Sequence, residues 1–184
     1  YMWSHLASCL IGTNDNQTFN IYTGSGANGK SKLVDLISKG LGEYKGTVPI
    51  TLVIQKRIGI GSTSSEVVQL QGTRYAVMQE PSKGDKINEG IMKEITGGDP
   101  IQCRALFKES ITFIPQFKLI VTTNNLFDIK SNDDGTWRRI RVCDFKSKFT
   151  DKPYNDEDKF PKEHYPYQYQ IDKKLDDKFT VWAP

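Results

Sequence analysis

Hydrophobic residues recur at two different spacings along the chain. Apolar residues lie at helical spacing, or follow a helix-start signal, in segments 1–10, 30–41, 66–70 and 87–95. Short apolar or alternating runs typical of strands occupy 18–22, 74–79, 117–122 and 139–145, and 102–114 has the pattern of a β-hairpin. Strands that interleave with helices in this order predict an α/β domain built on a mainly parallel sheet.

The pattern changes at Lys146. Charged residues, tyrosine and proline then follow without a regular period until 169–182, which is typical of a short helix. We therefore expect three parts along the chain. These are an N-terminal helix and lead-in at 1–17, a folded core at 18–145, and a charged linker with a short C-terminal helix at 146–184.

Length and charge restrict the function only mildly. A chain of 184 residues suits one domain with a sizeable core. The formal net charge of +3 comes from residues 1–145, because the charges in 146–184 balance. This mild excess permits a nucleic-acid partner without requiring one.

Cysteine usage and hydropathy point to a soluble intracellular protein. Cys9, Cys103 and Cys143 are odd in number, widely separated and without metal-binding spacing, so neither a disulfide framework nor a zinc site is indicated. A reducing compartment fits this usage best. No apolar run reaches the ~20 residues of a membrane span, and no signal-peptide pattern opens the chain. We expect no membrane partner.

A glycine-rich motif separates the first predicted strand from the second predicted helix. Gly24-x-x-x-x-Gly29-Lys30-Ser31 satisfies the G-x-x-x-x-G-K-[ST] pattern of phosphate-binding loops at every fixed position. The glycines let backbone N–H groups turn toward phosphate oxygens, Lys30 supplies charge for the β- and γ-phosphates, and the Ser31 hydroxyl can ligate Mg²⁺. The predicted nucleotide-binding residues are Gly24, Ser25, Gly26, Ala27, Asn28, Gly29, Lys30 and Ser31.

Two strand ends supply candidate catalytic groups. Glu80 follows the strand at 74–79, where it would polarise the attacking water and contribute to the metal site. The preceding Gln79 stands where an acidic residue is usual, so it cannot supply that negative charge to Mg²⁺. Asn124 follows the strand at 117–122 and could hold the attacking water and sense the γ-phosphate, whereas an ordinary turn asparagine would do neither.

A basic segment, Trp137-Arg138-Arg139-Ile140-Arg141, precedes and enters the last predicted strand of the core. Taken alone it is either the basic edge of a strand or the source of an arginine finger. A finger needs a guanidinium that reaches a phosphate bound by another subunit. The residues alone leave both interpretations open.

Four segments occur in the order found in superfamily 3 helicases. They are Lys93-x-x-Thr96-Gly97-Gly98-Asp99, the hairpin at 102–114, Thr122-Thr123-Asn124, and WRRIRV at 137–142. Over roughly residues 18–145 the chain resembles especially the poxvirus-type primase-helicases of nucleocytoplasmic large DNA viruses. The primase part and the collar of that family would lie before Tyr1.

The resemblance implies an AAA+ type P-loop ATPase with three layers, a central sheet and an inserted β-hairpin. Such proteins assemble as rings, usually hexamers, and use ATP and Mg²⁺ to move along single-stranded DNA in viral DNA replication. By this likeness Lys30 and Ser31 bind nucleotide and Mg²⁺, Glu80 is the catalytic acid, and Asn124 is the sensor. The expected location is the site of viral replication in a host cell, with other replication proteins as possible partners.

The same likeness assigns the remaining basic residues. Arg139 would be the arginine finger supplied to a neighbouring subunit, and Arg138 is the alternative. The hairpin would project into the central channel and grip DNA phosphate, with Lys108 at its tip and Arg104 in support. Such phosphate contacts do not depend on base identity.

Two other functions compete with a DNA motor. One is a P-loop module that acts as a nucleotide-dependent switch or as an assembly or packaging factor. Its target would be protein, for which a cationic hairpin tip has no use. The other is a small-molecule kinase, which shares the loop motif but leaves the GGD element at 97–99, the hairpin and the arginine pair unexplained.

Overall fold

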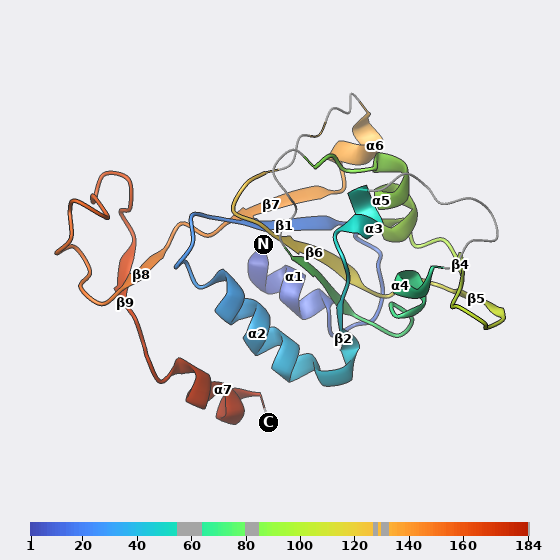
Figure 1. Ribbon diagram of the computed structural model, residues 1–184, viewed down its shortest axis with the longest axis horizontal. Coiled ribbons are helices and arrows are strands. Elements are labelled where there is room, and N and C mark those ends of the chain that lie inside the picture. The colour runs from blue at the N-terminus through green and yellow to red at the C-terminus, as the bar shows by residue number, and fades with distance from the viewer. Residues whose placement is uncertain (55–63, 80–84, 127–128, 130–132, 184) are drawn as a thin grey trace.

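The computed structural model describes residues 1–54, 64–79, 85–126, 129 and 133–183 of the chain. Five strands form a central sheet in the order β2-β3-β6-β1-β7 (Figure 1). They are β1 Phe19–Thr23, β2 Lys45–Thr47, β3 Tyr75–Gln79, β6 Lys118–Thr122 and β7 Ile140–Asp144. Every pairing described within this sheet is parallel, so the predicted α/β architecture with a parallel sheet is confirmed.

Helices pack on both faces of the central sheet (Figure 1). On one face lie α1 Met2–Ser8 and α2 Lys30–Leu41, which a 3₁₀ turn at Gly42–Tyr44 extends. The other face carries α3 Thr51–Ile54, α4 Ser65–Val68, α5 Glu89–Thr96 and α6 Asp134–Trp137. Among the described residues, no helix combines the length and apolarity needed to cross a membrane.

Strand side chains alternate between two hydrophobic cores, as the two-residue period of a strand requires. The core under α1 and α2 contains Leu6, Cys9, Tyr22, Val34, Leu41, Tyr75, Val77 and Ile120. Strand residues of the opposite core are Phe19, Ile21, Ala76, Met78, Leu119 and Val121. Because β3 and β6 are buried on both faces, their sequences are continuous apolar runs rather than alternating ones.

Two small sheets lie outside the central one. Strands β4 Ile101–Arg104 and β5 Ser110–Phe113 form an antiparallel hairpin, which confirms the hairpin predicted at 102–114. Strands β8 Lys148–Thr150 and β9 Gln168–Gln170 pair in parallel.

The helix predicted from residue 169 was placed too early. Residues 168–170 belong to β9, and α7 Leu175–Trp182 begins five residues later. A three-residue strand is too short to show a period, so its pairing with β8 could not be read from spacing. The division into parts at 17 and 145 stays a prediction.

Candidate functional site

Residues 24–31, here called the glycine loop, comprise the turn that follows β1 and the first two residues of α2. A Cβ on Gly24 would lie 2.1 Å from Asn28 Nδ2 and 2.8 Å from the carbonyl oxygen of Phe145, so a side chain does not fit there. Gly29 is the N-cap of α2 and has a φ of 83°, which strongly favours glycine. The first N–H groups of α2 have no partner within the helix, and such helix starts favour anions.

Lys30 and Asn124 meet beside this loop. The buried Lys30 ammonium donates hydrogen bonds to the Thr123 carbonyl oxygen at 2.7 Å and to Asn124 Oδ1 at 3.0 Å. The loop from Gly26 to Lys32 and the tip of β6 from Thr122 to Asn124 line a cavity of about 290 Å³. Residues 94 positions apart in the chain therefore share one polar cavity.

The topology of the sheet explains why the cavity forms at this place. From β1 the chain crosses to β2 at one edge of the sheet, whereas from β6 it crosses past β1 to β7 at the other edge. Neighbouring strands β1 and β6 thus lie at a switch point, where parallel sheets leave a crevice outside their carboxyl ends. The glycine loop follows β1 and Asn124 follows β6, so both reach this crevice.

The loop also fits a phosphate ligand in its polar groups. Asn28 is buried, its Oδ1 accepts from the Lys30 backbone N–H at 3.3 Å, and its Nδ2 has no hydrogen-bond partner among the described residues. An unpaired buried amide is costly, and a bound oxyanion would satisfy it. Ser31, exposed in the first turn of α2, could offer its hydroxyl to a cation beside that oxyanion.

Residues 145–149 hold the outer side of the glycine loop. The Phe149 backbone N–H donates to the Ala27 carbonyl oxygen at 2.7 Å, and that of Phe145 donates to the carbonyl oxygen of Thr23, the last residue of β1, at 2.9 Å. Lys148 Nζ donates to the Gly26 carbonyl oxygen at 2.9 Å. When N–H groups turn toward a ligand, the carbonyl groups of the same loop need other donors. This short segment supplies them.

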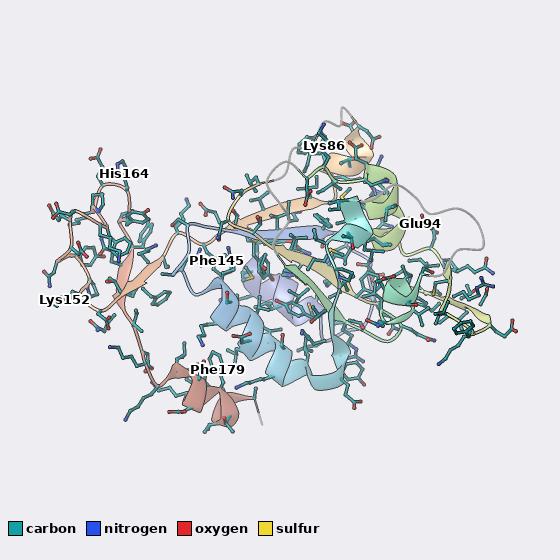
Figure 2. The ribbon with its side chains drawn as sticks, viewed as in Figure 1. Lys86, Glu94, Phe145, Lys152, His164 and Phe179 are labelled. Carbon is teal, nitrogen blue, oxygen red and sulfur yellow. The ribbon has the colours of Figure 1, made fainter. Side chains whose placement is uncertain are left out.

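Lys148 itself is firmly held. It is buried, and its ammonium lies 4.7 Å from the ring centre of Phe160 and 5.2 Å from that of Tyr165. Phe145 lies where the chain leaves the central sheet for the C-terminal segment 146–184. Lys152 and His164 lie in the outer part of that segment (Figure 2). Sequence reasoning missed Lys148 because a lysine among charged and aromatic residues matches no motif.

The arginine pair lies at the opposite end of the parallel strands from the glycine loop. Phe19, the first residue of β1, pairs with Ile140, and Thr23, the last, pairs with Asp144. Arg138 and Arg139 precede β7, so about 13 Å of strand separates them from the loop that follows β1, given a rise of ~3.3 Å per residue. The cavity is therefore distant from both guanidinium groups of its own chain.

The two arginines differ in exposure. Arg138 is exposed and donates to Gln17 Oε1 at 2.9 Å. Arg139 is only 8% exposed and donates to the Gly135 carbonyl oxygen at 2.6 Å and to Gln17 Oε1 at 3.2 Å. Burial, and then the charge of Arg138, lower the pKa of the Arg139 guanidinium, with Asp133 opposing that shift.

The hairpin β4–β5 extends away from the central sheet (Figure 1). Arg104 and Ser110 form its last cross-strand pair, and Lys108 lies in the turn between them, as predicted. Phe107 in the same turn is 96% exposed and has a φ of 58°. No sequence motif singled out Phe107. An aromatic residue beside a predicted cationic tip was the available signal.

Lys93 of the GGD-containing motif has a structural contact. Its ammonium forms an ion pair with Asp133, the N-cap residue of α6. The hydrogen bond from Lys93 is the main cause that lowers the pKa of the Asp133 carboxyl to about 2. The ion pair ties α5 to the short helix that leads into the arginine pair.

Of the predicted site residues, the structure brings together the glycine loop and Asn124. The arginine pair and the hairpin residues Arg104 and Lys108 lie elsewhere. Glu80 lies outside the described residues, as does the side chain of Gln79. Among the residues that are described, no group of three or more His, Cys, Asp or Glu side chains could hold a metal ion.

Comparison with known families places the chain. The sequence profile of DUF5906, described as a family of unknown function, matches residues 22–139, from the end of β1 to the arginine pair. The chain belongs to the DUF5906 family. The matched region of this DUF5906 protein includes the glycine loop, Asn124 and the hairpin, and it ends before residues 145–149 that hold the loop.

Relatives of this DUF5906 protein occur in nucleocytoplasmic large DNA viruses. A candidate helicase of Acanthamoeba polyphaga mimivirus, L207/L206, is 44% identical over 99% of the chain, which covers 19% of that protein. A candidate helicase of frog virus 3, 022R, is 34% identical over 92% of the chain and 18% of its own length. The African swine fever virus protein C962R, a candidate primase, is 27% identical over 86% of the chain and 17% of its own length.

These relatives confirm the viral helicase and primase resemblance inferred from the motifs. The chain spans about a fifth of the length of the curated relatives it matches. A solved structure, the apo C-terminal region of NrS-1, has a TM-score of 0.63 at 13% identity over 97% of the chain and 38% of that structure. This similarity supports the fold of the DUF5906 protein.

Proposed function

We propose that this chain is the ATPase motor of an AAA+ type, superfamily 3 DNA helicase of viral DNA replication. It would hydrolyse ATP between the subunits of a ring, with six copies as the expected number, and move along single-stranded DNA. The proposal rests on the relatives, which are candidate helicases and primases, and on the geometry of the site.

One observation carries the proposal. Lys30 and Asn124 share a polar cavity at the switch point of the sheet, while the arginine pair lies about one strand length away at the other end of the strands. A chain with this arrangement holds the phosphate-binding half of a hydrolytic site and presents a cationic group elsewhere. Two copies that meet head to tail would complete the site, which is how a ring assembles.

Each residue near the cavity has a proposed task. The glycine loop binds the phosphates, and Lys30 attracts the β- and γ-phosphate charge. Asn124 orients the attacking water, and Glu80 accepts its proton. Ser31 and Glu80 would hold Mg²⁺, which when bound neutralises charge on the phosphate oxygens.

The exposure of the arginines bears on the finger. A guanidinium that stabilises the transition state must reach a neighbour's phosphate. Arg138 is exposed and has only its bond to Gln17 to give up among the hydrogen bonds described, whereas the buried Arg139 must leave both Gly135 and Gln17. We keep both as candidates and propose that the pair acts together.

The hairpin favours a nucleic-acid track over a protein-binding switch. Its turn exposes Lys108 for phosphate and Phe107 for stacking on a base, a combination typical of single-strand binding. We expect Lys108→Ala to lower the salt slope of single-stranded DNA binding by about one counterion. Phe107→Ala should weaken binding by about 1–3 kcal/mol and leave that slope unchanged.

Fluorescence anisotropy of a labelled oligothymidylate, titrated at several salt concentrations, measures both effects. Thr112→Ala changes an exposed residue of β5, outside the turn, and should bind as the wild type does. If all three variants bind single-stranded DNA as the wild type does, with the wild-type salt slope, the hairpin turn is not the DNA contact.

The segment at 145–149 gives a second test at the nucleotide site. Lys148→Met removes the donor to the Gly26 carbonyl oxygen. Gly26 is half-buried, and a carbonyl that loses its donor there costs up to about 1–3 kcal/mol, so the affinity for a fluorescent ATP analogue should fall up to about tenfold. Lys152→Met, an exposed change in the same C-terminal segment, is the matched control. Equal affinities in both variants would contradict a role for Lys148 in holding the loop.

The function as a whole is tested by ATP turnover with and without single-stranded DNA, measured together with the mass of the protein in solution. We expect turnover that single-stranded DNA stimulates and a mass several times that of one chain. ATP turnover that DNA never stimulates would favour the non-motor alternative. No nucleotide binding at all would contradict the whole proposal.

A further inference from the structure

Gln17 lies between the arginine pair and the C-terminal end of α5. It lies in the turn from α1 to β1 with a φ of 49°, a conformation that costs non-glycine residues roughly 1–2 kcal/mol. Its backbone N–H donates to the Asn14 carbonyl oxygen at 3.0 Å. A strained backbone of this kind suggests that the place of the side chain matters.

The Gln17 side chain makes three contacts at once. Its Oε1 accepts from Arg138 at 2.9 Å and from Arg139 at 3.2 Å. Its Nε2 donates to the carbonyl oxygen of Gly97, the residue that ends α5. One amide group therefore connects the two arginines that precede β7 to the C-terminal end of α5.

The end of α5 leads directly to the hairpin. Strand β4 begins at Ile101, four residues after Gly97. The same turn makes a second bond to α5, because Asn14 Nδ2 donates to the Thr96 carbonyl oxygen at 3.0 Å. The last carbonyl groups of a helix need such donors, so the turn and the end of α5 should move together.

The hold on the arginines is weak enough to be released. Two guanidinium groups share one neutral oxygen, and Arg139 Nε is buried without a hydrogen-bond partner among the described residues. A phosphate is anionic and can accept two parallel hydrogen bonds from one guanidinium, which the single neutral Gln17 oxygen cannot do. A phosphate brought close by a neighbouring subunit would therefore compete successfully with Gln17.

We propose that Gln17 is a positioning residue that holds Arg138 and Arg139 back and, through Gly97, links their release to the hairpin. This inference rests on the proposed function, because it needs a neighbour's phosphate as the competing acceptor. As a consequence, ATP hydrolysis and the position of the hairpin influence each other through the Gln17 side chain. Gln17 touches no reacting atom in this scheme.

Two substitutions separate the two halves of the contact. Gln17→Glu keeps an acceptor for both arginines and makes it anionic, but it cannot donate to Gly97. Gln17→Ala removes both contacts. Asn14→Ala is the matched control, since it removes a bond from the same turn to α5 without touching an arginine.

The measurements are kcat and KM for ATP at increasing concentrations of single-stranded DNA, with thermal melting of each variant. In Gln17→Glu the carboxylate should hold the arginines more tightly, so kcat should fall about tenfold at unchanged KM and recover partly with salt. In Gln17→Ala the KM should also be unchanged, and DNA should stimulate kcat less than twofold. Asn14→Ala should keep wild-type DNA stimulation.

Two results would overturn the inference. One is wild-type kcat and DNA stimulation in both Gln17 variants. The other is an equal loss in all three variants with a raised KM, which indicates only a structural role for the turn. Both differ from failure of the proposed function, in which the wild type itself shows no ATP turnover.

Discussion

Replacing Lys30 with alanine is expected to lower ATP turnover at least about a hundredfold. The Lys30 ammonium is buried beside the glycine loop, where it bonds to the Thr123 carbonyl oxygen and Asn124 Oδ1. Phosphate would take over part of this bonding, and the buried site strengthens each charge-assisted bond. Loss of one preorganised donor typically costs 10²–10³ in rate.

The measurement is steady-state phosphate release, with ATP affinity from a fluorescent analogue. Lys39→Ala is the control, because Lys39 is an exposed residue in the last turn of the same helix. Both binding and turnover should fall in the Lys30 variant alone. Normal turnover without Lys30 would mean that the glycine loop is not the nucleotide site.

Removing the arginine pair should have the larger effect on rate and a small effect on binding. A finger supplied by a neighbour contributes ~10³–10⁵ in turnover, and it touches the γ-phosphate late in the reaction. We therefore expect Arg138→Ala and Arg139→Ala to keep ATP affinity and to lose turnover. Arg139→Ala should also destabilise the fold by about 1–3 kcal/mol, because it leaves the Gly135 carbonyl oxygen without its donor.

Mixing a variant with wild-type protein distinguishes an arginine finger supplied to a neighbouring subunit from an arginine that acts within its own chain. Wild-type protein titrated with either variant should lose activity faster than dilution predicts, since each variant leaves a neighbour's site incomplete. Arg141→Ala, two or three residues further along and within β7, is the control. It should lower the activity of the mixture no more than dilution predicts. Activity that falls only in proportion to dilution in every mixture would remove the assignment in trans.

The central sheet could be predicted from the sequence because its strands carry strong signals. Strands β3 and β6 are apolar on both faces, and β1 precedes a glycine motif that occurs in one structural setting. The hairpin could be predicted because apolar and polar residues alternate along both of its strands. Asn124 was found because it follows a buried strand.

The short elements escaped prediction. Strands β2, β8 and β9 have three residues each, and α3 and α6 have four. A segment shorter than one or two periods carries no periodic signal, and tertiary contacts decide its conformation. Lys148 and Gln17 escaped for a related reason. Each acts through a contact with a residue more than 100 positions away, which no local pattern records.

The bonds from residues 145–149 to the glycine loop have a consequence for how the protein is made. The glycine motif is synthesised before its partners, because β1 pairs with residues near 119 and 140 and the loop carbonyl groups accept from Lys148 and Phe149. Chains are synthesised from the N-terminus at ~5–20 residues per second. The glycine motif is therefore synthesised several seconds before the residues that complete its surroundings.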